Sequence, residues 1–243
     1  HSPVINRTDA INILGTMQGG YNVEIMINLL NNDELAPYVV KELKNTILIF
    51  DYYYTIEKLY KKGNPFAKEI IESWASGEWF KNKTTVPEKI SLTVFKVNGE
   101  INTDDLSPAQ DAWSRPDIPL HSLCMFKNER DDIIPDDLSN VGPINEINLL
   151  KKGSKYPVAF AGDVVGTGSS RKSATNSLLW HFGNDIPYVP NKRTGGYCIG
   201  SKIAPIFFNT MEDSGALPIE MPVKDINRGD VIDIYPYEGS VSY

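Results

Sequence analysis

The segment 162–173 carries the densest set of groups that could do chemistry in this sequence. It follows an apolar stretch typical of a short strand, and it opens a stretch whose apolar residues have helical spacing. A helix N-terminus presents free N–H groups and a partial positive charge of roughly half a unit, which together bind anions. The predicted helix start carries two hydroxyls and two cationic side chains, those of Ser169, Ser170, Arg171 and Lys172. The segment therefore predicts an anion cradle with an activatable hydroxyl.

The ligand predicted for this cradle is a small polycarboxylate. An arginine binds a carboxylate through two parallel hydrogen bonds, and a serine hydroxyl beside positive charge ionises more easily than one in water. The phosphate-binding glycine motifs do not fit, because Gly166 and Gly168 lack the third glycine of the dinucleotide fingerprint and no G-K-[ST] ends the loop. The residues alone leave one alternative open, in which Ser169 or Ser170 caps the helix and Arg171 is a surface charge.

Two further polar segments are candidate binding loops. Residues 102–109 include the adjacent carboxylates of Asp104 and Asp105, and residues 113–119 include Arg115. Adjacent carboxylates near an arginine would suit a binding loop. Asp, Ser and Pro are also turn residues for mechanical reasons, so a structural turn is favoured for these segments taken alone.

Residue types that often bind metals give no such signal here. His121 and His181 have no partner at ligand spacing, so both are predicted to be structural histidines. Cys124 and Cys198 are far apart and lack CxxC or Cys/His spacing, which excludes a zinc ribbon and a disulfide framework. Cys198 is predicted to be packed and inert. The residues by themselves predict no metal site.

The chain that must position these groups changes its apolar period near residue 84. Up to residue 80, apolar residues recur at helical spacing in about five segments, which predicts stacked helical hairpins. Thr8 is predicted to cap the first helix and Gly19–Gly20 to close it. Asn64 followed by Pro65 predicts the start of another helix.

The second half mixes strands with short helices. Alternation over residues 90–94, followed by Asn98–Gly99, predicts a strand that enters a hairpin. The acidic stretch 131–137 is predicted to be a solvated loop. Later predicted elements are a strand at 157–161, a helix at 170–182 and a strand at 230–235. This half is therefore predicted to be α/β or α+β.

Composition excludes several classes of protein. The 243 residues are 41% hydrophobic and 23% charged, which excludes disorder as the main state. The net charge of −7 disfavours nucleic-acid binding without a local basic patch, such as Lys192–Arg193. No apolar run approaches the roughly 20 residues that span a bilayer, so a soluble, cytoplasmic protein without a membrane partner is predicted. The first residues lack an initiator Met and a signal peptide, which predicts a piece of a longer chain.

Six segments of the sequence carry a resemblance to a known family. They are residues 14–22, 93–97, 102–109, 112–121, 162–177 and 202–213. Together they closely resemble the aconitase B type of bacterial aconitate hydratase, and the similarity runs over nearly the whole chain. That family interconverts citrate and isocitrate through cis-aconitate, and it also dehydrates 2-methylisocitrate. The resemblance therefore implies a lyase of the tricarboxylic acid cycle that acts on these substrates.

The resemblance also implies a domain order. Residues 1–84 resemble the last part of a HEAT-like helical domain, built of helical hairpins. Residues 85–243 resemble the aconitase swivel domain, a layered β/β/α fold. The implied fold class is therefore α plus α/β. In the family, three further α/β domains hold a [4Fe-4S] cluster, and the resemblance implies that these are missing beyond Tyr243.

Carried over to this sequence, the resemblance assigns roles to the polar segments. Ser169 is implied to be the catalytic base, whose alkoxide removes the proton alpha to a carboxylate, with Ser170 beside it in the substrate site. Arg171 is implied to bind a substrate carboxylate and to stabilise the ionised serine. Arg115 is implied to be a further carboxylate clamp. These roles agree with the residue chemistry, because citrate is a trianion and guanidinium groups and helix N–H donors complement it.

In one loop the sequence departs from the family, and it lacks the cluster ligands. Asp104 matches an active-site aspartate, but Asp105 follows it where the related aconitases have histidine. The cluster iron acts in the family as a Lewis acid on the departing hydroxyl, and it needs three cysteine thiolates. Two unsuitably placed cysteines cannot supply them. This chain alone is therefore predicted to be inactive.

Two other functions stay open at this point. The resemblance implies iron-dependent homodimerisation through the N-terminal region and mRNA binding by the cluster-free form, so the helical arm and the swivel would serve as an interaction module. A third hypothesis is a small subunit like that of isopropylmalate isomerase. The helical arm argues against that hypothesis, because those small subunits lack one.

Overall fold

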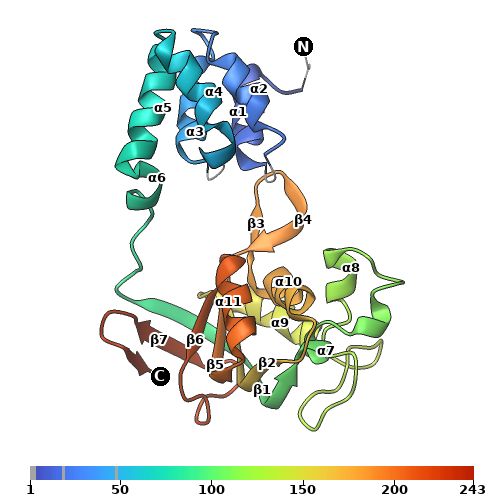
Figure 1. Cartoon of the computed structure of the whole chain (residues 1–243). Helices are drawn as coiled ribbons and strands as arrows, with labels where there is room; N and C mark the ends of the chain where they lie inside the picture. Colours follow the sequence, from blue (N-terminus) through green and yellow to red (C-terminus); the bar gives the residue numbers. More distant parts are fainter. Residues whose placement is uncertain (1–3, 18–19, 47–48) are drawn as a thin grey trace. The chain divides into compact units, whose positions relative to one another are not determined.

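The computed structural model describes residues 4–17, 20–46 and 49–243. The chain forms two compact units, His1–Thr85 and Val86–Tyr243 (Figure 1). In the described part of the chain, every helix is too short or too polar to cross a membrane.

The first unit consists of helices around one apolar core. Its helices are α1 (Arg7–Thr16), α2 (Val23–Leu29), α3 (Ala36–Lys44), α4 (Ile49–Lys61), α5 (Pro65–Ser76) and α6 (Glu78–Lys81). The indole of Trp74 on α5 donates a hydrogen bond to the Leu43 carbonyl at 3.0 Å, which joins α5 to the end of α3. The apolar stripes of these helices meet in a buried core that includes Leu30, Val39, Leu43, Ile56 and Ile70.

The helix starts in this unit follow short polar side chains, with one correction. Asn64 caps α5 by accepting the Ala67 N–H at 2.9 Å, and Pro65 takes the first helical position, which confirms the prediction. The cap predicted at Thr8 was wrong. Asn6 caps α1 instead, because its extended backbone lets the side chain accept the Asp9 N–H at 2.8 Å. The predicted helix end at Gly19–Gly20 falls partly outside the described residues, and α1 itself ends at Thr16.

The second unit contains a main sheet in which parallel pairing dominates. The strand order is β6-β5-β2-β1-β7-β8, with parallel pairing from β6 to β1 and antiparallel pairing at β7 and β8. A small hairpin pairs β3 (Asn184–Ile186) with β4 (Val189–Thr194). The main strands are β1 (Ile90–Asn102), β2 (Val158–Thr167), β5 (Tyr197–Ile203), β6 (Leu217–Glu220), β7 (Val231–Tyr235) and β8 (Ser240–Ser242). The mixed helix and sheet architecture agrees with the predicted class.

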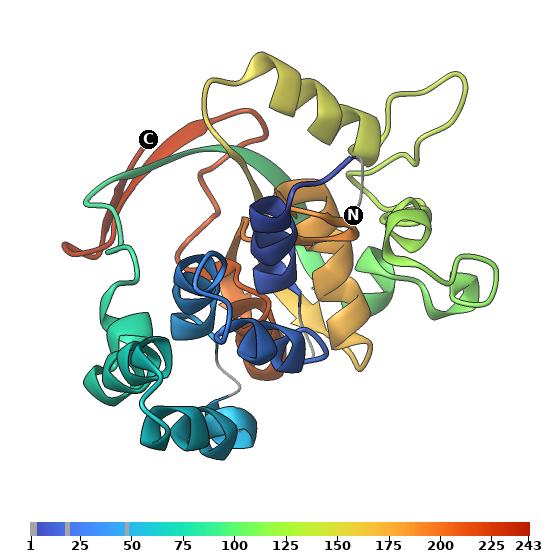
Figure 2. The ribbon, with the colours of Figure 1, turned by 90° about the horizontal axis from the view of Figure 1, so that it is seen from above.

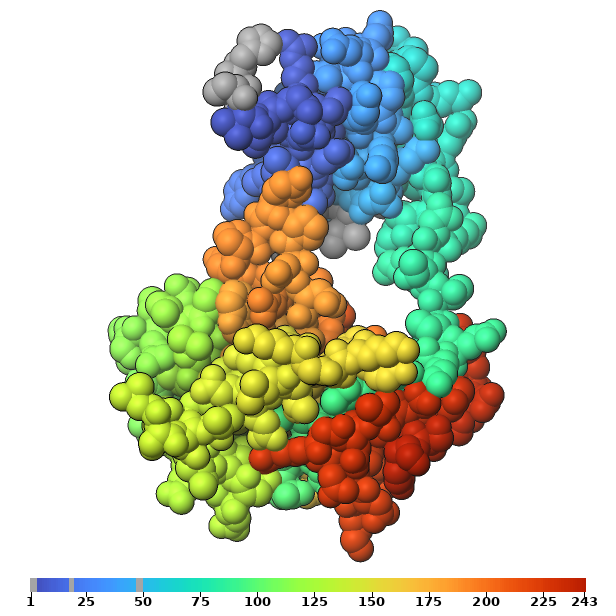
Figure 3. Space-filling model, turned by 180° about the vertical axis from the view of Figure 1, so that it is seen from behind, coloured from blue at the N-terminus to red at the C-terminus, as the bar shows by residue number. Residues whose placement is uncertain are grey.

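Both faces of this sheet are covered, and β1 alternates between them. Phe95 and Val97 pack into a cluster with the helices, whereas Leu92 and Val94 pack with Val223 and Ile226 on the other face. Helices α9 and α10 lie over the same side of the sheet (Figure 2), and α9 is also visible in yellow in the space-filling view (Figure 3). The helices are α7 (Thr103–Leu106), α8 (Ile118–Ser122), α9 (Pro143–Gly153), α10 (Arg171–Phe182) and α11 (Pro205–Asp213).

The hairpin predicted at Asn98–Gly99 was wrong. Strand β1 continues through these residues to Asn102 and pairs in parallel with β2, with a register shift between Val97 and Glu100. Gly99 takes a positive φ of 77°. The freed N–H groups of Asn98 and Gly99 find carboxylates of Asp132 and Asp163 at 2.7 and 2.6 Å. The Asn-Gly pair therefore forms an irregularity inside a strand, because tertiary acceptors replace the turn.

The acidic stretch 131–137 is a loop, but two of its carboxylates make structural contacts. Asp136 accepts the N–H groups of Gly142, Ile144 and Asn145 at 2.9–3.0 Å, where α9 begins. Asp132 accepts the Asn98 N–H. The prediction of a purely solvated loop was therefore incomplete.

Buried His181 on α10 makes stability depend on pH. Its Nε2–H donates to the Ser122 carbonyl at 2.9 Å, and burial lowers its pKa from 6.5 to about 4. The unfolded chain therefore binds a proton that the folded chain excludes between these values, and stability falls as the pH drops from 6.5 to about 4. We expect the loss to reach roughly 3 kcal/mol. Urea unfolding measured between pH 6.5 and about 4 should show that the free energy of unfolding depends less steeply on pH in His181→Asn than in the unsubstituted protein. An equally steep dependence would contradict the role of His181.

Candidate active site

The carboxyl ends of three parallel strands meet at one edge of the sheet. Asn102 of β1 pairs with Thr167 of β2, and Val165 of β2 pairs with Ile203 of β5. Helices α7, α10 and α11 begin directly or within a few residues after these strand ends (Figure 1). Ligands of open α/β sheets bind at such edges. Four of the predicted site residues lie at this edge, namely Asp104, Ser169, Ser170 and Arg171.

Two glycines allow the turn between β2 and α10 to pack closely on its neighbours. Gly166 and Gly168 have positive φ angles of 81° and 109°. A Cβ on Gly166 would lie 2.2 Å from the Phe207 ring of α11, and a Cβ on Gly168 would lie 2.4 Å from Oγ1 of Thr103. Only glycine combines these angles with such close approach. The turn is therefore fitted between α7 and α11.

Neither serine hydroxyl of the turn is used to hold the helix. Ser170 occupies the N-cap position of α10, yet its side chain makes no cap hydrogen bond. Its backbone N–H donates to Thr103 Oγ1 at 3.2 Å, and its carbonyl accepts the Ala174 N–H. Ser169 is exposed, and neither hydroxyl forms a hydrogen bond within the described ranges. The alternative in which one of these hydroxyls caps the helix is therefore not realised.

The serine turn and the guanidinium border one cavity of about 350 Å³. Arg171 is half-buried, and its side chain forms no ion pair within residues 4–17, 20–46 and 49–243. The backbone N–H groups of Lys172 and Ser173 also have no acceptor among the described residues. Serine hydroxyls, a guanidinium and backbone N–H groups without described partners therefore lie together at the start of α10. This set of donors suits an anion with several carboxylates. The lining residues are Ser169, Ser170, Arg171, Lys172 and Ser173 with Ile206 and Thr210.

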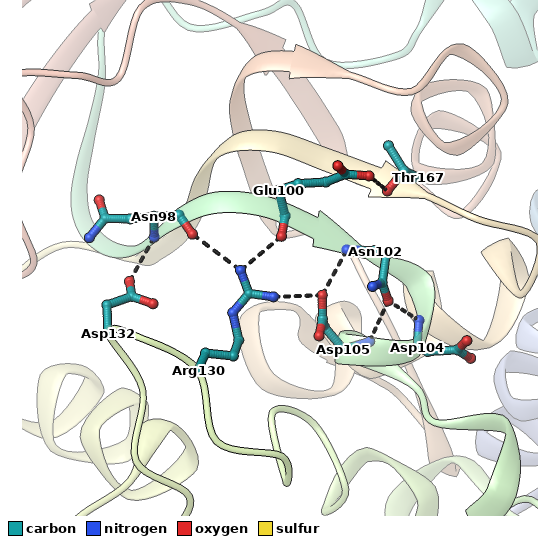
Figure 4. A network of polar contacts seen from close by, with 8 residues as sticks. All are labelled: Asn98, Glu100, Asn102, Asp104, Asp105, Arg130, Asp132 and Thr167. Carbon is teal, nitrogen blue, oxygen red and sulfur yellow. Dashed lines mark hydrogen bonds and ion pairs between the residues drawn. The ribbon is translucent and has the colours of Figure 1, made fainter.

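The adjacent carboxylates of α7 have different environments (Figure 4). The Asp105 carboxylate accepts the Asn102 N–H at 2.9 Å, and Asn102 in turn accepts the Asp104 and Asp105 N–H groups, which forms a capping box. The Asp104 carboxylate is exposed and points away from this network. The Asp105 carboxylate therefore has a structural role in this chain, whereas the Asp104 carboxylate is free to contact a ligand.

Arg130 holds the end of β1, and no sequence pattern predicted this role. Its guanidinium pairs with Asp105 at 2.8 Å and donates to the carbonyls of Asn98 and Glu100 at 3.2 and 2.8 Å (Figure 4). Arg130 lies 25 residues after Asp105 in a loop, and no local pattern marks it. Its contacts could be found only from the tertiary structure.

Removing this guanidinium is expected to destabilise the fold. Arg130→Ala leaves a partly buried carboxylate on Asp105 and two carbonyls without their donor, so the free energy of unfolding should fall by about 2 kcal/mol. Chemical denaturation measures the change. Lys68→Ala, which breaks the exposed ion pair with Glu72, is the control and should change little. Equal effects of the two substitutions would contradict the structural role of Arg130.

Arg115 lies beside a neighbouring cavity rather than in the serine cavity. Its guanidinium donates to the Leu120 carbonyl at 3.4 Å. The next residues, Pro116 and Asp117, line a cavity of about 200 Å³ together with Ser173 and other residues of α10. Ser173 borders both cavities. In the described part of the chain, the structure thus brings Ser169 and Arg171 together and leaves Arg115 near an adjoining space.

Family models match both halves of the chain. The model described as Aconitate hydratase 2 N-terminus matches residues 92–243, and the model described as Aconitate B N-terminal domain matches residues 1–80. This chain belongs to the aconitate hydratase B family. Aconitate hydratase B of Pseudomonas aeruginosa is 61% identical over 241 residues, which are 99% of this chain and 28% of that protein. The chain therefore spans about a quarter of the length of this relative.

Two weaker similarities carry another name. The 3-isopropylmalate dehydratase small subunit 3 of Arabidopsis thaliana is 25% identical over 218 residues, with 84% of this chain and 72% of that protein covered. A solved structure of 3-isopropylmalate dehydratase from Methanocaldococcus jannaschii aligns with a TM-score of 0.41 and 18% identity. This alignment covers 63% of this chain and 79% of that one.

The residues of this chain do not fit the iron–sulfur cluster that resemblance to the aconitate hydratase B family implies. Cys124 and Cys198 are both buried, and burial raises their pKa values, that of Cys198 to about 12. Cluster ligation requires thiolates, which burial disfavours. Within the described residues, no group of three or more His, Cys, Asp or Glu side chains is placed to hold a metal ion.

Proposed function

We propose that this chain supplies the catalytic base and a carboxylate-binding group of an aconitate hydratase that interconverts citrate and isocitrate through cis-aconitate. The observation that carries the proposal is the shared cavity of Ser169 and Arg171, whose hydroxyl and guanidinium form no hydrogen bond or ion pair with other described residues. Membership of the aconitate hydratase B family supports it.

In this proposal Ser169 and Arg171 divide the work on the substrate. The Ser169 alkoxide takes the proton from the carbon alpha to a carboxylate, and Oγ then holds that proton. Arg171 binds a carboxylate through its two-pronged donor and stabilises the alkoxide by its charge. The open N–H groups of Lys172 and Ser173 add donors for the same anion.

The remaining site residues take supporting roles in the same proposal. Ser170 contacts the substrate beside the base, Arg115 clamps a further carboxylate from the adjoining cavity, and Asp104 supports the site from α7. The substrates are citrate, isocitrate, cis-aconitate and 2-methylisocitrate. We also propose that residues 1–84 form a HEAT-like arm and that residues 85–243 form a swivel domain.

Activity is proposed to require more protein than this chain. Ser169 is exposed here, and a serine alkoxide is stable only where water is excluded. We therefore propose that the chain is part of a longer protein whose other domains cover the cavity. Those domains would also hold a [4Fe-4S] cluster, which supplies Lewis acid chemistry on the departing hydroxyl.

The experiment compares the full-length protein with residues 1–243 alone. Formation of cis-aconitate from citrate, followed by ultraviolet absorbance, should be readily detected for the full-length protein and absent for the isolated chain. Turnover by the isolated chain would contradict the need for further domains. A full-length protein that does not act on citrate or isocitrate would overturn the proposed function.

No structural observation favours the interaction module as a second function. The basic pair Lys192–Arg193 is the example of a local patch for mRNA binding. Arg193 pairs with Asp185 at 2.8 Å, and its guanidinium lies 4.4 Å from the centre of the Trp180 ring. These contacts occupy the guanidinium that a phosphate backbone would need. Homodimerisation and mRNA binding remain predictions, for which a salt titration by gel shift is the test.

A further inference from the structure

We propose that Thr103 is a positioning residue for the serine turn, an inference that rests on the proposed function. Thr103 is the first residue of α7 and is 2% exposed. Its Oγ1 accepts the backbone N–H of Ser170 at 3.2 Å, across 67 residues of sequence. It thus links the end of β1 directly to the turn that follows β2.

Thr103 also contacts the backbone at Gly168, the residue before Ser169. The Cα of Gly168 approaches so closely that a Cβ there would lie 2.4 Å from Thr103 Oγ1 and 3.5 Å from its Cβ. One buried hydroxyl therefore touches the backbone at Gly168 and at Ser170. Ser169, the residue between them, has no hydrogen bond from its own hydroxyl within the described ranges. The position of the Ser169 side chain consequently depends on the backbone that Thr103 holds.

Thr103 is itself firmly held, so it can impose its position on the turn. The capping box of Asn102 and Asp105 fixes the start of α7, and Arg130 ties Asp105 to the end of β1. The two strand ends are also linked by Thr167, whose hydroxyl donates to the Glu100 carboxylate at 2.6 Å (Figure 4). The chain of contacts runs from the strand edge through Thr103 to the serine turn.

Removal of the Thr103 hydroxyl should lower the rate of catalysis more than it lowers the affinity for substrate. A displacement of about 1 Å at a reacting group can lower the rate about 100-fold. The carboxylate-binding groups of α10 begin at Arg171, within a helix that its own packing holds. Loss of the Thr103 hydroxyl should therefore misplace the Ser169 oxygen and leave most carboxylate contacts in place.

The test compares three threonine substitutions in the full-length enzyme. Thr103→Val keeps the side-chain shape but removes the acceptor, and kcat should fall about 10-fold to 100-fold while KM changes less than about threefold. Thr103→Ser keeps the oxygen and should restore kcat to within about threefold of the unchanged enzyme. Thr175→Val is the matched control, because Thr175 is buried on α10 and its hydroxyl has no hydrogen-bond partner among the described residues. Its kcat and KM should not change.

A second readout does not depend on activity. Amide hydrogen exchange at Ser170 should accelerate in Thr103→Val and remain slow in Thr103→Ser and Thr175→Val. If Thr103→Val does not fold, Thr103→Ala replaces it in the comparison with Thr103→Ser. Equal kcat losses for the serine and valine variants, an unchanged kcat in the valine variant, or an unchanged exchange rate would each overturn the proposal. If the proposed function is wrong, the unsubstituted full-length protein will have no hydro-lyase activity. The amide exchange rate of Ser170 would then still test whether Thr103 holds the turn.

Discussion

In the full-length protein, Ser169→Ala should lower kcat for citrate about 10³-fold or more. The substitution removes the oxygen proposed to take the proton and leaves Arg171 and the helix N–H donors in place. Citrate affinity should therefore change only a few-fold. Ser169 is exposed and its hydroxyl forms no hydrogen bond with the part of the chain that the structure describes, so the free energy of unfolding should not change. Steady-state kinetics, calorimetric citrate binding and chemical denaturation measure the three quantities.

Ser170→Ala is the matched control for this prediction. The two serines are neighbours that line the same cavity, and neither hydroxyl caps α10. A serine that only contacts substrate should cost far less in kcat than the base. Near-normal turnover of Ser169→Ala together with a large loss in Ser170→Ala would move the base assignment to Ser170.

Arg171→Lys should lower kcat/KM about 100-fold, the second-largest effect. Lysine keeps the charge but cannot form two parallel hydrogen bonds to one carboxylate. The guanidinium forms no ion pair with the described residues, so thermal stability should remain unchanged and the loss can be assigned to the substrate. Lys172→Arg is the control, because the Lys172 side chain is exposed and its replacement should alter kcat/KM little. Unchanged citrate kinetics for Arg171→Lys would contradict the carboxylate-binding role.

Local signals in the sequence were sufficient for much of the fold. The Asn64–Pro65 pair predicts the start of α5, because a cap and a proline act within one helical turn. The apolar run at 157–161 predicts the start of β2, which continues to Thr167, and the helical spacing at 170–182 predicts α10, since both patterns lie in consecutive residues. Family strings at 102–109 and 162–177 also single out both segments that meet at the site edge.

The sequence by itself determined which groups the site contains, since residue types and short-range periods are local properties. Only the tertiary structure decided how they are used. Asn98–Gly99 has the composition of a hairpin turn, but carboxylates 34 and 64 residues away accept its N–H groups and β1 runs on. Thr103 meets Ser170 only because β1 and β2 lie side by side, and Asp105 pairs with Arg130 only because the loop that carries Arg130 returns to the end of β1. Such contacts depend on strand pairing across a long crossover, which packing of the whole sheet determines and no local pattern encodes.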